Sequence, residues 1–353
     1  MEFSGIVPYI IKNIGAIAGA NDPQVKIDSP GFLQMLLDFS PNIQRPEIVD
    51  GECRDLKIRY MPRGCDNTID EPVCVGTLAP AWKEVTIPQL KYTGIGIRID
   101  YDLLCKLQRE AMQTESMGNP SAEGWRILWA FMRSNINDLL ATIDKNLLAD
   151  QALAWGNNIA YDPVVNTAQN ISFGKAQGMT DGIVRLIADA QANNITGRFP
   201  ICGNGAVNNF YIWNNMKSGN DFLGFGSRPM DFSIYNDVYS QEIWGRDHFG
   251  VFEPGYVGLI HVNQYGNIIK GDWDGSFYFR LPIILENGRS IMFDAMMKRD
   301  GCPLPAIHLI IGMHYALWNM PNDIYNTCDR MSGYNGSLHY IGQNEDCIKV
   351  CTI

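Results

Sequence analysis

The feature that most constrains the fold is one helical pattern that runs without a break from about residue 120 to about residue 155. About 35 residues at 1.5 Å each span roughly 50 Å. Asn119 and Pro120 suit the start of a helix, and Gly156 suits its end. Polar residues such as Asp144 lie between the apolar ones, as an amphipathic helix requires. The apolar positions recur at three- and four-residue steps: Trp125, Leu128, Trp129, Met132, Ile136, Leu139, Leu140, Ile143 and Leu147.

An apolar stripe of that length needs a long flat partner, and a β-sheet is the natural one. Three late runs, 276–285, 290–300 and 306–318, read as strands, and the helix is expected to pack on the sheet that they form. Between the helix and these runs, residues 174–216 read as helix, strand and helix, and 255–264 reads as a further strand. The tail, 326–353, is rich in Gly, Asn and Tyr, and no element is assigned to it.

Residues 52–100 are expected to form two extended arms with a wide loop between them. In RDLKIRY (54–60) apolar residues alternate with charged ones, and in KYTGIGIRID (91–100) isoleucines alternate in the same way. Pro88 makes the middle of the return arm an edge strand or a bulge. A two-stranded ribbon alone is marginal in water, so this excursion is expected to need a partner surface.

Composition excludes several classes of function. The net charge is −10 with no block of Lys or Arg, whereas a general nucleic-acid binder needs a basic footprint. No window reaches the roughly 18 consecutive apolar residues of a membrane span. The nine cysteines are odd in number and irregular in spacing, which predicts reduced thiols rather than a zinc set or a disulfide framework.

No catalytic spacing stands out, so no catalytic residue, cofactor or metal is expected. The sequence lacks G-x-G-x-x-G, the P-loop pattern and G-x-S-x-G. His308 and His314 would share one face of a strand but stand roughly 20 Å apart, too far to share a metal. His248 has Asp247 beside it but no nucleophile placed by a motif.

The excursion instead carries the residue types that protein interfaces favour. Trp82 has no obvious core of its own, and charged residues surround it. A ribbon that folds back on its own domain is the alternative interpretation. The predicted assembly interface comprises Arg59, Arg63, Trp82, Lys83, Glu84 and Lys91.

The order of parts resembles the HK97 fold of tailed-bacteriophage major capsid proteins. The resemblance covers roughly 30–320 and lies in an arm, an excursion ending KYTGIGIRIDYDLL, a very long helix ending IDKNLLADQALAWG, a small α/β unit and returning strands. It implies an α+β fold with an antiparallel sheet under a spine helix at about 120–155. The implied parts are an N-terminal arm (1–51), an E-loop (52–100), a P domain (101–173 and 276–325), an A domain (174–275) and a tail (326–353).

The resemblance also implies a function without an enzyme activity. The expected protein self-assembles, as hexamers and pentamers, into the icosahedral head around the double-stranded DNA of a tailed phage, so it belongs to the virion and assembles in the bacterial cytoplasm. Expected partners are portal, scaffold and decoration proteins, with weak non-specific contact to packaged DNA and none to membranes. An encapsulin-like shell is one alternative, and a cytosolic α/β enzyme using a His or Cys is another.

Overall fold

The structure is a computed structural model. It describes residues 27–41, 43, 47–49, 55–60, 83–87, 90–117, 123–156, 169–172, 186–187, 190, 195, 198–205, 232–263, 269–270, 276–300, 306–320 and 336–343. The chain divides into two compact units, each built from three stretches. The first unit comprises Met1–Ser29, Lys91–Ile143 and His261–Tyr315, and the second comprises Pro30–Leu90, Asp144–Ile260 and Ala316–Ile353.

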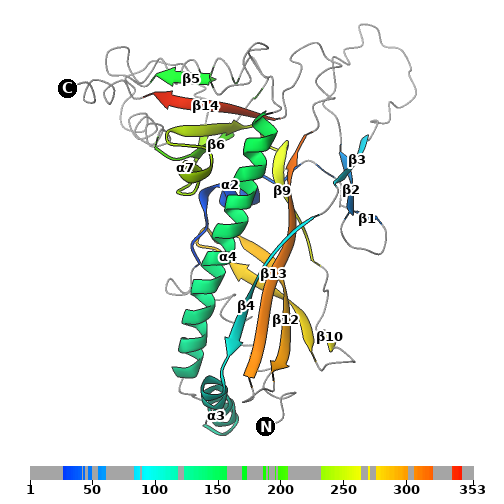
Figure 1. The fold of residues 1–353 in the computed structure, drawn as a ribbon, viewed down its shortest axis with the longest axis vertical. Coiled ribbons are helices and arrows are strands. Elements are labelled where there is room, and N and C mark those ends of the chain that lie inside the picture. Colours follow the sequence, from blue (N-terminus) through cyan, green and yellow to red (C-terminus); the bar gives the residue numbers. More distant parts are fainter. Residues whose placement is uncertain are drawn as a thin grey trace, which may run out of the picture. The chain divides into compact units, whose positions relative to one another are not determined.

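A large antiparallel sheet forms the first unit (Figure 1). The three late runs are confirmed as strands of this sheet. Along the first and the third of them, buried side chains tend to alternate with more exposed ones. Their inward-facing apolar side chains, such as Phe293, Leu309 and Ile311, are almost fully buried. The strand order is β10 (Ile269–Lys270), β11 (Phe277–Ile284), β12 (Ser290–Asp300), β13 (Ala306–Asn319) and β4 (Lys91–Ile99), and β9 (Val257–Val262) also pairs with β13.

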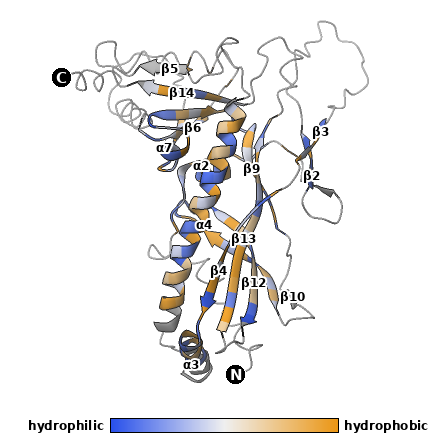
Figure 2. Cartoon of the chain, viewed as in Figure 1, coloured by the Kyte–Doolittle hydropathy of each residue, from blue (hydrophilic) through white to orange (hydrophobic). Residues whose placement is uncertain are grey.

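The long helix is α4, Glu123–Gly156, and its 34 residues end at the predicted glycine. Its part in the first unit lies beside β4 and β13 in Figure 1, and Figure 2 shows apolar residues along it and along β13. The buried positions follow the predicted three- and four-residue steps: Leu128, Met132, Ile136, Leu139, Leu140 and Ile143. A second helix, α3 (Tyr101–Met117), precedes it along the chain.

The second unit contains two smaller sheets. The first of these is antiparallel, with order β1 (Glu47–Val49), β2 (Asp55–Tyr60) and β3 (Lys83–Ile87). The other is mixed, with order β5 (Gln169–Ser172), β14 (Ser337–Gln343), β8 (His248–Phe252), β6 (Phe199–Gly203) and β7 (Phe232–Asn236). The short helices α2 (Gly31–Asp38) and α7 (Ser240–Ile243) belong to this unit, as does the rest of α4.

Two features differ from the sequence-based expectation. Only β3 returns along β2, because β4 leaves the ribbon and pairs with β13 from Ile307↔Ile99 to Tyr315↔Lys91. Ile97 and Ile99 gain full burial there, which a two-stranded ribbon does not provide. The tail is not featureless either, since β14 lies between β5 and β8. The helix expected at 205–216 lies outside the described residues, apart from Gly205.

Candidate assembly interface

The outer face of the β2–β3 ribbon carries a short ladder of charges. Glu84 of β3 is the register partner of Arg59 on β2, and Arg59 Nε lies 2.6 Å from Glu84 Oε1. The other carboxylate oxygen pairs with Lys57, which is two residues from Arg59 on β2 and on the same face. Hydrogen bonds from Lys57 and then Arg59 lower the pKa of Glu84 below its usual value. All three side chains remain partly exposed, so the ladder adds little to stability and is sensitive to salt.

The opposite face of β2 is covered by this chain itself. Leu56 and Ile58 are fully buried, and Tyr60 is only 4% exposed. The Tyr60 ring lies 5.5 Å from that of Trp318, at the second-unit end of β13. The ribbon therefore has more core of its own than the sequence suggested.

The structure brings together only part of the predicted interface. Arg59 and Glu84 form an ion pair, and Lys83 stands exposed opposite Tyr60 at the end of the ribbon. Lys91 belongs to β4 and the first unit, where it pairs with Tyr315, so it is not part of this ribbon. Arg63 and Trp82 lie outside the described residues.

A buried polar cluster in the second unit was missed by the sequence analysis. Asp237 is fully buried and precedes α7, where its Oδ1 accepts hydrogen bonds from the N–H groups of Tyr239 and Ser240. Asp144 of α4 is also fully buried, although it was expected on the polar side of the helix. Its spacing of four from Leu140 and Leu148 was the available signal, because these positions share one helix face.

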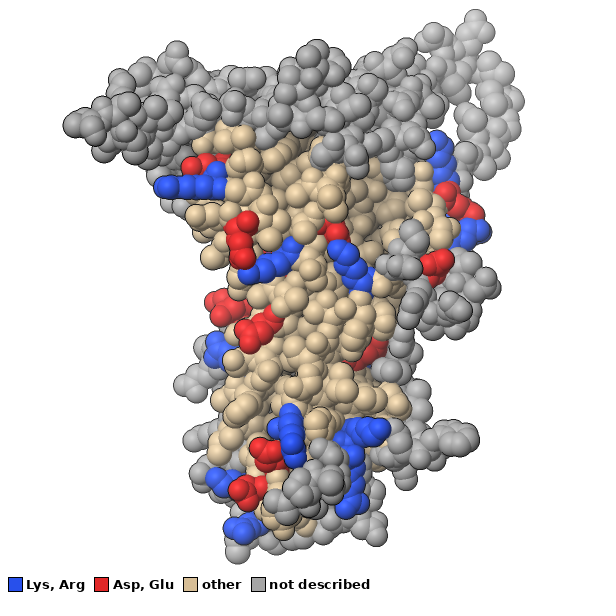
Figure 3. Space-filling model, viewed as in Figure 1, with Lys and Arg blue, Asp and Glu red and all other residues tan. Residues whose placement is uncertain are grey.

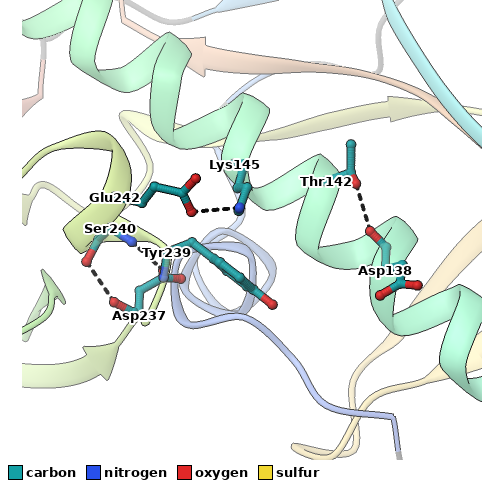
Figure 4. A network of polar contacts seen from close by, with 7 residues as sticks. All are labelled: Asp138, Thr142, Lys145, Asp237, Tyr239, Ser240 and Glu242. Atoms are coloured by element: carbon teal, nitrogen blue, oxygen red, sulfur yellow. Dashed lines mark hydrogen bonds and ion pairs between the residues drawn. The ribbon is translucent and has the colours of Figure 1, made fainter.

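Lys145, next to Asp144 on α4, reaches outward to α7. Its Nζ lies 2.7 Å from Glu242 Oε2 and 5.1 Å from the centre of the Tyr239 ring. Figure 4 shows this ion pair beside the α7 start, where Ser240 Oγ donates to the Asp237 carbonyl oxygen at 2.7 Å. The same turn of α4 therefore provides a buried carboxyl group, that of Asp144, and an exposed ion pair with α7, formed by Lys145.

Further along, α4 is hydrogen-bonded to two segments that are remote in sequence. Trp244 Nε1 donates to the carbonyl oxygen of Leu148 at 2.8 Å. Ser337 Oγ, at the first residue of β14, accepts from both Gln151 Nε2 and Trp155 Nε1 at 3.0 Å each. The start of β14 is thereby fixed to the end of the long helix.

Two histidines meet beside the same helix end. His248 Nδ1 of β8 lies 2.9 Å from His339 Nε2 of β14, and the His339 ring stacks on Trp155 with centroids 4.1 Å apart. Burial, followed by the charge of His248, lowers the pKa of His339 to about 3. Burial also lowers the pKa of His248. Within the described ranges, no three His, Cys, Asp or Glu side chains come close enough to hold a metal ion.

The visible surface is mixed in charge. In Figure 3 the described Lys and Arg side chains lie near Asp or Glu, in small groups of both signs. Among the described helices, none is long and apolar enough to cross a membrane. Both described cysteines, Cys105 and Cys202, are free thiols.

The chain is similar to solved bacteriophage structures. The capsid asymmetric unit of cyanophage A-1(L) shares 11% identity with a TM-score of 0.47, covering 91% of this chain and 94% of that one. A Mycobacterium phage Adephagia structure shares 9% identity with a TM-score of 0.43, covering 97% and 98%. The Staphylococcus phage Andhra capsid shares 8% identity with a TM-score of 0.40, covering 92% and 87%. No protein-family model matches the sequence, and no curated protein matches it.

Proposed function

We propose that this chain is the structural major capsid protein of a tailed bacteriophage, which self-assembles into the head around double-stranded DNA. The observation on which the proposal depends is the pairing of two strands, far apart in sequence, in the first-unit sheet. The strand β4, before the long helix, pairs over nine residues with β13, which follows the strands β5 to β8 of the mixed sheet along the chain. That order of arm, ribbon, long helix, inserted unit and returning strand is the one expected of an HK97-like subunit.

In this proposal the described elements take the parts of the capsid fold. The first-unit sheet with α4 is the P domain, and α4 is its spine helix. The mixed sheet around β6, β7 and β8 lies in the A domain, and β2 with β3 belongs to the E-loop. The role is structural rather than enzymatic, and the protein's place is the virion capsid assembled in the host cytoplasm.

The open face of the first-unit sheet supports self-association. Two cross-strand pairs lie there: Pro282 of β11 stands opposite Met292 of β12, and His314 of β13 stands opposite Tyr92 of β4, whose ring lies 4.7 Å from the His314 ring. Tyr92 is 52% exposed and Met292 is 37% exposed. Contact with another subunit would remove this apolar surface from water.

Charge supports the remaining partner assignments. The chain is acidic and its described surface mixes both signs, so contact with packaged DNA is weak and non-specific. Hexamers and pentamers of the chain itself are the principal contacts. Portal, scaffold and decoration proteins complete the set that a phage head requires.

Electron microscopy of the purified full-length chain, with size-exclusion chromatography, tests the proposal. We expect rings, capsomers or shells. A folded monomer that assembles under no condition, even with its partner proteins present, would refute it. The ribbon is tested separately with Lys83→Glu, which should leave the subunit folded but lower the shell yield, and with Lys83→Arg, which keeps the charge and should behave as wild type.

A further inference from the structure

The short helix α2 is seated closely in the second unit. Phe32 is fully buried, with its ring 5.5 Å from Trp244 in an edge arrangement and 5.7 Å from Phe252. Gly31 leaves no room for a side chain, because a Cβ there would lie 2.3 Å from the backbone oxygen of Asn236. The helix therefore lies directly against the end of β7.

Two carboxyl groups from remote positions meet the N-terminus of α2. The residue before the helix is Pro30, which supplies no side-chain cap. The N–H of Phe32 donates to Asp237 Oδ2, and that of Leu33 donates to Asp144 Oδ1, each at 2.8 Å. Both carboxyl groups are fully buried. They take the place of the local cap that most helices have.

The positive charge at this site offsets only part of the charge of one carboxylate, and much less of the charge of two. A helix N-terminus is equivalent to roughly half a positive charge. Lys145, the residue after Asp144 on α4, is at the surface and is paired with Glu242. Titratable groups on the adjoining elements are Cys202 of β6, Tyr235 of β7 bonded to Asp38 of α2, and Tyr239 before α7. The cation Arg198, just before β6, donates to Ser233 of β7, and its charge acts on Tyr235.

Hydrogen bonding distinguishes the two carboxyl groups. Asp237 accepts three N–H bonds with its two oxygens, as a carboxylate does. Asp144 Oδ2 accepts none from any described group, which suits a protonated oxygen, and the Asp237 carboxylate is its neighbour. Burial first, and then the Asp237 charge, raise the pKa of Asp144 well above its usual value. The hydrogen-bond pattern and the direction of this shift both assign the proton of the pair to Asp144.

We propose that Asp144 and Asp237 form a one-proton acid pair that latches α2 into the second unit, and that loss of this proton at alkaline pH releases the helix. Two buried carboxylates without a cation repel each other and need water. Undocking α2 admits that water, because the helix is only eight residues long and its N-terminus is bound to these two groups. Because α2 lies within the segment expected to form the N-terminal arm (1–51), the latch fixes residues 31–38 of that segment in the second unit. It does not depend on the proposed shell function.

Hydrogen exchange of the full chain across pH tests the latch. Protection factors of the amides in 31–38, corrected for intrinsic exchange, would be followed from roughly pH 6 to 10, since burial can raise a carboxyl pKa by up to 3–5 units. Once α2 is released the carboxyl groups regain an ordinary pKa, so below the raised pKa of the pair the docked state holds one more proton than the released state. In the wild type we therefore expect protection to fall about tenfold for each pH unit up to the pKa of the pair and to level off above it.

Two variants assign the proton. Asp144→Asn keeps an oxygen for the Leu33 N–H and an N–H₂ group that can donate to Asp237, but it cannot ionise, so its protection should stay flat. Asp138→Asn removes an exposed acid of the same helix and should follow the wild type. Cys202 remains in both variants, so a flat profile in Asp144→Asn alone assigns the effect to the acid pair.

Several results would overturn the proposal. One is wild-type protection that does not change with pH, and another is the same loss in Asp144→Asn as in wild type. If Asp144→Asn does not fold, infrared spectroscopy of the wild type still decides. The carbonyl stretch of a protonated buried carboxyl group should be present at neutral pH and vanish around the pH at which the loss of α2 protection levels off. Its absence at neutral pH would refute the shared proton.

Discussion

Replacing Ser337 with Ala tests whether the C-terminal strand is an integral part of the second unit. Ser337 Oγ is the acceptor for two buried donors, Gln151 Nε2 and Trp155 Nε1, both at 3.0 Å. The alanine variant removes this acceptor and leaves both donors without it. A buried donor without a partner costs about 1–3 kcal/mol, so we expect a loss of about 2–4 kcal/mol in the free energy of unfolding.

Urea unfolding followed by near-ultraviolet circular dichroism measures this loss, because the Trp155 and Trp244 rings pack 4.6 Å apart. Ser290→Ala, at an exposed strand end, is the matched control and should change stability by no more than about 0.5 kcal/mol. Trp155→Phe removes one of the two donors, so combining it with Ser337→Ala should cost less than the sum of the single changes. A Ser337→Ala loss below about 0.5 kcal/mol, or strict additivity, would show that these hydrogen bonds do not hold β14.

Three further predictions concern the ribbon, the histidine pair and α2. Trp82→Ala should leave circular dichroism unchanged while shell yield falls, because a buried interface tryptophan can contribute about 2 kcal/mol or more per contact; an unfolded subunit would instead mean that the ribbon packs on its own domain. His339 has a lower pKa folded than unfolded, so stability should fall as pH drops from about 6.5 toward about 3, by about 2 kcal/mol at pH 5. In urea titrations at several pH values, His339→Gln should remove this part of the acid sensitivity, and an unchanged profile would contradict it. Gly31→Ala should increase hydrogen exchange throughout α2, since its Cβ meets the backbone oxygen of Asn236; unchanged exchange would mean that α2 shifts without loss of contact.

Local elements could be read from the sequence because their periodicity is set by neighbouring residues. The spacing of Leu128, Met132 and Ile136 predicted α4, and its glycine end was correct. Alternation likewise predicted β2, and the late apolar runs predicted β11 and β13. The α+β class and the antiparallel sheet were implied by the resemblance to the HK97 fold, and the structure has helices and antiparallel sheets.

Pairing between distant segments was decided only by the tertiary structure. The isoleucines of 91–100 alternate in the same way whether their neighbour is β2 or β13, and the choice of β13 depends on the core that Ile97 and Ile99 complete. The strand β14 stayed hidden because its partners, β5 and β8, are far from it in sequence.

The buried acid pair shows the same limit at the level of single residues. Asp144 lies at a position of α4 that the helical period could place on the buried face, but nothing near it in sequence accounts for a buried carboxyl group. Its hydrogen-bond donor is Leu33, 111 residues earlier, and its neighbour Asp237 comes from a separate turn before α7. Periodicity determines which face of an element is buried, because backbone geometry repeats locally. Which polar groups meet on that face depends on contacts that form only when remote segments pack together.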